Sequence, residues 1–129
     1  MRTLIIEGSN IHNIPTFYDE INRLFMFGED WKIGNSLDAL NDVLYGGFSG
    51  MDAKEHIELT WNNIEASKKA LGYETTRTYY LEKLQPDSPF NKKHFLEQLE
   101  QLENNTGKTY FDLVMEVIAD HKNITLTEA

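Results

Sequence analysis

The sequence predicts an α/β domain with a small three-stranded parallel sheet and helices packed on it. Strand-like stretches at residues 3–7, 55–60 and 123–127 alternate with helical stretches, a pattern typical of parallel strands joined by helical crossovers. The chain has 129 residues and no cysteine, so a single domain over 1–129 must form its core without disulfides. A chain of this length buries roughly two thirds of its unfolded surface, which is sufficient for such a core.

The first strand and the first helix have clear local signals. The run Leu4-Ile5-Ile6 contains no polar residue, which predicts a strand covered on both sides. A helix is expected to start near Asn13 and Pro15, because proline lacks the N–H that the first helical turn leaves unpaired anyway. Apolar residues then recur at helical spacing until Gly28 ends the element.

A short helix over residues 36–45 is predicted to be strongly two-sided. Ser36 is placed to cap its first turn, and Gly46-Gly47 to stop it. Its apolar residues share one face: Leu37, Leu40, Val43 and Leu44. Asp38 and Asp42 fall on the opposite face at 100° per residue, so a compact acidic surface is expected there.

The second half of the chain continues the alternation. The strand at 55–60 is followed by an expected helix at 61–71, with Trp61 directed inward, and by a weaker helical pattern at 73–84. Ser88 is expected to cap the next helix, which runs to about residue 103. Thr109 then caps a helix at about 110–120, before the strand at 123–127.

The charge balance limits the classes of partner. With 12 Lys and Arg against 21 Asp and Glu, the net charge is -9, which disfavours nucleic acid and anionic membranes because both are polyanions. The same charge favours a basic partner or simply supports solubility. The N-terminal apolar run is too short for a signal peptide, and no run approaches the ~20 residues that span a bilayer. We therefore expect a cytoplasmic protein.

The sequence contains no recognisable catalytic or cofactor motif. The glycines near residue 47 fit neither a dinucleotide fingerprint nor a P-loop, and the four histidines lack metal-ligand spacing, so no cofactor or metal is expected. Paired carboxylates such as Asp38 and Asp42 can act as acid and base, but no His, Cys or Lys motif accompanies them. From these patterns alone the function stays open, and a charged helix face is usually only solvated.

The stretch Gly34-Asn35-Ser36-Leu37-Asp38-Ala39-Leu40-Asn41-Asp42-Val43-Leu44 resembles the barstar-like family of intracellular ribonuclease inhibitors. Three further blocks agree in order: the first strand ending at Gly8, the stretch from Leu59 to Lys68, and the stretch from Met115 to Leu126. The resemblance covers most of residues 2–72 and 108–127. The segment 73–107 has no counterpart in short members of the family and is expected to be a helical insertion.

This resemblance implies an inhibitor and not an enzyme. Family members fill the basic active site of a ribonuclease with acidic side chains that stand in for RNA phosphates. Asp38 and Asp42 match the family's two helix acids, Glu116 matches its acid on the last helix, and Trp31 matches its aromatic contact. The resemblance therefore predicts a basic ribonuclease or nuclease toxin as the partner. It also predicts that Glu116 converges on one face with the two aspartates.

Two other interpretations stay open from the sequence. The fold could serve as a non-inhibitory protein–protein interaction module that uses the segment 73–107. Each acid could also be an ordinary surface residue; Asp38, for example, lies in a first helical turn, where a negative charge is favoured in any case. An enzyme that uses the paired carboxylates is the least favoured interpretation.

Overall fold

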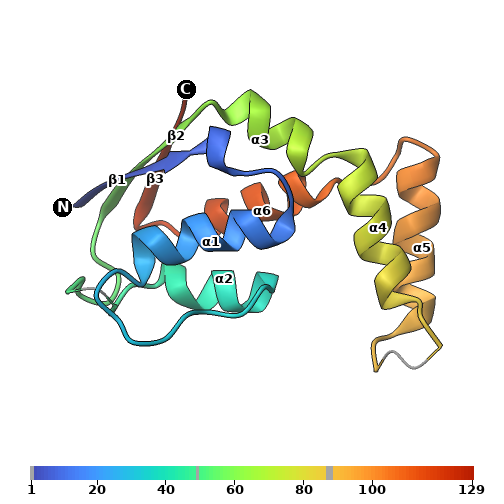
Figure 1. The fold of residues 1–129 in the computed structure, drawn as a ribbon, viewed down its shortest axis with the longest axis horizontal. Coiled ribbons are helices and arrows are strands. Elements are labelled where there is room, and N and C mark those ends of the chain that lie inside the picture. The colour runs from blue at the N-terminus through green and yellow to red at the C-terminus, as the bar shows by residue number, and fades with distance from the viewer. Residues whose placement is uncertain (1, 49, 87–88) are drawn as a thin grey trace.

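The computed structural model describes residues 2–48, 50–86 and 89–129, and it contains a three-stranded sheet. Strands β1 (Arg2–Glu7), β2 (Ile57–Asn62) and β3 (Ile124–Glu128) are all parallel and lie in the order β1-β2-β3 (Figure 1). The predicted fold class is confirmed. Because β2 is the central strand, its inward residues form the middle of the core.

Among the residues that the structure describes, helices cover one face of this sheet and leave the other open. Along β2, three alternate side chains are buried while those between them are half-buried: the buried ones are Ile57, Leu59 and Trp61. In β1 the same alternation leaves Ile5 47% exposed, although Ile6 is fully buried. The prediction that the first strand is covered on both sides is therefore wrong. An apolar residue occupies the open face of β1, and a continuous apolar run does not distinguish that case from two-sided burial.

Within the described residues the chain forms six α-helices: α1 (Ile14–Phe25), α2 (Leu37–Leu44), α3 (Ile64–Ala70), α4 (Tyr73–Lys83), α5 (Lys92–Glu103) and α6 (Tyr110–Ala119). A 3-10 helix, η1 (Gly8–Asn10), follows β1. Side chains of Asn13, Ser36 and Thr109 each accept a hydrogen bond from a backbone N–H three residues later. These caps confirm the predicted starts of α1, α2 and α6, since each satisfies one unpaired N–H of a first turn.

Trp61 lies on β2 and not on the helix that follows it. The sequence predicted a helix over 61–71, but α3 begins only at Ile64, after Asn63 adopts a left-handed backbone conformation with φ of 53°. The alternation of strand residues continues through Trp61, whose side chain is fully buried. Its indole Nε1 donates a hydrogen bond of 2.9 Å to the hydroxyl of Ser67 on α3, which joins strand and helix.

The segment 73–107 folds as a pair of helices, α4 and α5, which lie side by side at one end of the structure (Figure 1). The pair has its own small core of Tyr80, Leu99 and Leu102. The helix predicted at 73–84 is confirmed. Helix α5 starts at Lys92 with Asn91 as its cap, later than the sequence suggested; Ser88, the predicted cap, lies outside the described residues.

Candidate functional site

Helix α2 presents Asp38 and Asp42 on its solvent-exposed side. Three side chains on its opposite face are buried: Leu40, Val43 and Leu44. The hydroxyl of Ser36 accepts the N–H of Ala39 at 3.1 Å, which fixes the first turn. Both aspartates are exposed to solvent, and Asp38 lies at the edge of a hollow described below. The predicted two-sided helix is therefore confirmed, and its exposed side carries two carboxylates one turn apart, an arrangement suited to binding cationic groups.

Glu116 is exposed on α6, the helix that packs beside α2. Its Oε1 lies 2.7 Å from the ammonium of Lys108, in an ion pair whose side chains are both more than half exposed. Lys108 and Leu113 also line a hollow of about 590 Å³ that contains Asp38. Glu116 therefore lies close to the hollow that contains Asp38. Its carboxylate is already paired with Lys108 of the same chain. Convergence of all three acids on one bound partner stays a prediction.

Trp31 lies on the loop that joins α1 to α2, and its side chain is 49% exposed. Its ring packs edge-on against Phe48, with ring centroids 5.6 Å apart. Phe48 follows the end of α2, whereas Asp38 lies in the first turn, and an eight-residue helix is about 12 Å long. Trp31 therefore belongs to the opposite end of α2 from Asp38, closer to Asp42 along the helix.

Buried His121, two residues beyond the end of α6, contacts the C-terminal half of α2. His121 is 4% exposed, and its Nε2 lies 2.8 Å from Oδ1 of Asn41. The ring of Tyr45 packs edge-on against the imidazole at 4.5 Å between centroids. Burial lowers the pKa of His121, while the neighbouring Asp120 carboxylate opposes that shift. The neutral imidazole is therefore the form that the fold prefers.

Acidification is expected to destabilise the protein through His121. Because the pKa of His121 is lower in the folded chain than its ordinary value of 6.5, the unfolded chain binds the proton more readily. The contribution of neutral His121 to the free energy of unfolding is fully present above pH 6.5, and it decreases as the pH drops below that value. Urea denaturation at pH 8 and pH 5.5 measures this loss.

His12 offers a matched control for that measurement, because it is an exposed histidine. In the His121→Asn variant the difference in unfolding free energy between the two pH values should shrink. In the His12→Asn variant it should stay as in the parent protein. Equal pH dependence in both variants would contradict the role given to His121.

The segment 73–107 contributes aromatic and basic side chains next to α2, which the sequence did not predict as site residues. Tyr79, Lys83 and Phe90 line the hollow that contains Asp38. Burial raises the pKa of Tyr79, and the nearby Asp38 carboxylate raises it further, so the phenol and the carboxylate lie within electrostatic range. The only sequence signal for these residues was their position in the segment 73–107, which the resemblance predicts to be an insertion; the family model, however, matches through residue 85 and so includes Tyr79 and Lys83.

Other kinds of site have little support within the described part of the chain. Among the residues that the structure describes, no three His, Cys, Asp or Glu side chains are grouped so that they could hold a metal ion. Over the same residues, no helix combines the length and the apolar character needed to cross a membrane.

Comparison with known families agrees with this geometry. The family model described as Barstar (barnase inhibitor) matches residues 1–85, about two thirds of the chain, so the chain belongs to the Barstar family. The match runs from β1 through α4 and includes α2, whereas α6 and Glu116 lie beyond it. The family consists of inhibitors and not enzymes, which indicates a barnase-type inhibitor role at the family level. No curated protein and no solved structure matches the chain.

Proposed function

We propose that the protein inhibits a basic ribonuclease by placing the acidic side of α2 in the active site of the enzyme. The observation that carries this proposal is the exposure of Asp38 and Asp42 on a helix whose other side is fixed in the core of a Barstar-family chain. Ribonuclease active sites bind RNA phosphates with Arg, Lys and His side chains, and carboxylates form charge-assisted hydrogen bonds with the same groups. The two aspartates would therefore take the place of phosphates.

Glu116 and Trp31 would complete this binding face from the neighbouring α6 and the α1–α2 loop. Glu116 would add a third acid once its carboxylate is shared with, or released from, Lys108, a contact that costs little because exposed ion pairs contribute only about 0–1 kcal/mol. Trp31, about half exposed beside Phe48, would offer an aromatic surface near the end of α2. Aromatic residues are frequent among the side chains that dominate interface energies.

The decisive experiment measures inhibition with barnase, the enzyme named in the family description, as the first probe. We expect stoichiometric inhibition that competes with an RNA substrate. The net charge of -9 should accelerate association with a basic enzyme, so the association rate should fall at least about tenfold between low and high salt. Any nuclease encoded by a neighbouring reading frame is the second probe, because toxins and their inhibitors are often encoded side by side.

Two outcomes would overturn the proposal. One is a complex that still cleaves RNA at the uninhibited rate, which would favour the non-inhibitory interaction module. The other is the absence of inhibition of both nucleases. A partner that binds with a salt-independent association rate would also argue against electrostatic occlusion, since steering by exposed charges is screened by salt.

A further inference from the structure

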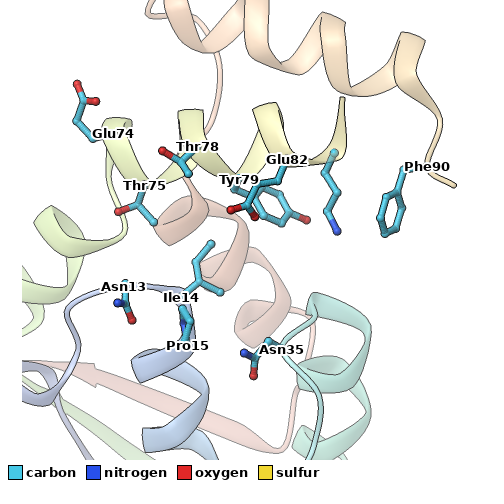
Figure 2. Close-up of a pocket in the computed structure, with 11 residues that line it drawn as sticks. Asn13, Ile14, Pro15, Asn35, Glu74, Thr75, Thr78, Tyr79, Glu82 and Phe90 are labelled. Atoms are coloured by element: carbon cyan, nitrogen blue, oxygen red, sulfur yellow. The ribbon is translucent and has the colours of Figure 1, made fainter. Parts of the chain in front are cut away.

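A groove of about 690 Å³ lies between α4 and the body of the protein, outside the acidic side of α2. Ile14 and Pro15, at the start of α1, form one wall, and residues of α4 form the other. Figure 2 shows Tyr79 and Glu82 directed from α4 toward that wall, with Phe90 at the far end. The groove therefore combines apolar and aromatic surface with a carboxylate, and asparagine and threonine side chains line much of the rest.

The charge of the groove fits a cationic group. Among the described residues neither Glu82 nor Glu74, the two acids that line the groove, takes part in an ion pair. Glu82 points into the groove, while Glu74 is turned outward at its other end (Figure 2). A guanidinium can stack on an aromatic ring and bind a carboxylate through two parallel hydrogen bonds, which a lysine cannot do.

The aromatic wall already holds a cation from the chain itself. The ammonium of Lys83 lies 3.7 Å from the centroid of the Phe90 ring and 5.2 Å from that of Tyr79. These rings therefore present faces that attract positive charge. Lys83 also places one positive charge at the groove, so its removal should strengthen the binding of an incoming cation.

The groove continues into the face that is proposed to inhibit the nuclease. Asn35 lines it and directly precedes Ser36, the cap of α2. Tyr79, Lys83 and Phe90 line both this groove and the hollow that contains Asp38. A protein that covers the N-terminal end of α2 therefore has the groove within reach.

We propose that this groove binds an arginine side chain presented by the basic nuclease, so that the segment 73–107 extends the inhibitory face beyond α2. This inference rests on the proposed function for the identity of the partner. Helix α4 and Phe90 thereby select among nucleases that share a phosphate-binding active site but differ in the surrounding loops.

The test uses the full chain labelled with ¹⁵N and two tripeptides, Ac-Gly-Arg-Gly-NH2 and its citrulline analogue, which keeps the shape of arginine without the charge. The arginine peptide should shift the amide signals of Thr75, Thr78 and Glu82, and the citrulline peptide should not. Glu82→Gln should weaken binding of the arginine peptide at least about threefold. Glu74→Gln is the matched control and should leave the affinity nearly unchanged, while Lys83→Met should increase it.

Equal responses to the two peptides, or equal affinities of the Glu82→Gln and parent proteins, would overturn the groove as an arginine site. The peptide assay contains no nuclease, so it is independent of the proposed function. If the arginine peptide binds but barnase and the neighbouring nuclease are not inhibited, the proposed function fails and the arginine site stands. If a nuclease is inhibited equally by the Glu82→Gln and parent proteins, the nuclease does not occupy the groove.

Discussion

Replacing Asp42 by alanine is expected to weaken inhibition of the target ribonuclease at least about 30-fold, equivalent to roughly 2 kcal/mol or more of binding free energy. Asp42 lies on the exposed side of α2, so in a complex that covers this helix its carboxylate would be desolvated against the cationic groups of the active site. Truncation leaves those cations buried without a partner, and this penalty makes such residues dominant. Inhibition constants for the parent and variant proteins measure the effect.

Asp38 and Glu116 should follow Asp42 with distinguishable losses. Asp38→Ala should weaken inhibition and also cost about 0.3–1 kcal/mol of stability, because the aspartate lies in the first turn of α2. Glu116→Ala should have the smallest effect, since its carboxylate is shared with Lys108. Glu65→Ala is the matched control, an exposed acid in the first turn of α3, and it should leave inhibition unchanged.

An equal inhibition constant for the Asp42→Ala and parent proteins would contradict the binding role of α2. Unfolding free energies make that result interpretable. Asp42 is exposed and its side chain takes part in no hydrogen bond or ion pair among the described residues, so truncation to alanine should change stability by less than about 0.5 kcal/mol. A loss of inhibition with unchanged stability is therefore a loss of contact with the enzyme.

The local signals of the sequence were sufficient for most elements of the fold. Ser36 and Thr109 were placed correctly as helix caps because hydroxyl side chains satisfy the same unpaired N–H groups in any helix. The two-sided pattern of α2 was equally reliable, since its leucines and aspartates separate cleanly at 100° per residue. These predictions depend on contacts within a few residues of the chain.

The errors concern properties that depend on distant parts of the chain. Ile5 is about half exposed because no helix of the described part of the chain covers the second face of the sheet, and the run Leu4-Ile5-Ile6 gives no sign of this. Trp61 was assigned to a helix because its spacing to Ile64 and Leu71 fits a helix, although its spacing to Ile57 and Leu59 also fits a strand. Its place on β2 is decided by pairing with Ile6 and Glu128 on the two neighbouring strands.

The residues of the candidate site also differ in whether local sequence or distant contacts determine their place. The acids of α2 and α6 were assigned to the site from resemblance to the family, and their role in binding stays a prediction. The aromatic groove could not be predicted, since it forms only when Phe90 and Tyr79 meet the start of α1 across more than sixty residues of chain. The ion pair of Glu116 with Lys108 could not be predicted from the sequence either, because both residues are exposed and belong to no shared sequence pattern.

Replacing Trp61 by alanine is expected to destabilise the protein by about 3–5 kcal/mol, a large part of the ~5–15 kcal/mol that holds a typical domain folded. The side chain is fully buried in the central strand, with its ring 6.0 Å from that of Phe17 on α1 and 5.6 Å from that of Phe111 on α6. The cavity would therefore open where the sheet meets two helices, and the hydroxyl of Ser67 would lose its indole partner.

Trp31→Ala is the matched control, because the same side chain is removed where it is 49% exposed. Urea denaturation followed by circular dichroism at 222 nm compares both variants without relying on tryptophan fluorescence. Trp31→Ala should cost less than half as much stability, since only part of its surface leaves water on folding. The Trp31→Ala variant should nevertheless weaken inhibition if Trp31 belongs to the binding face.

Equal unfolding free energies for the two variants would mean that β2 is not the centre of the core. The expected result is that Trp61→Ala mainly lowers stability and Trp31→Ala mainly weakens inhibition. This result would separate the residues that form the core beneath α2 from those that contact the nuclease.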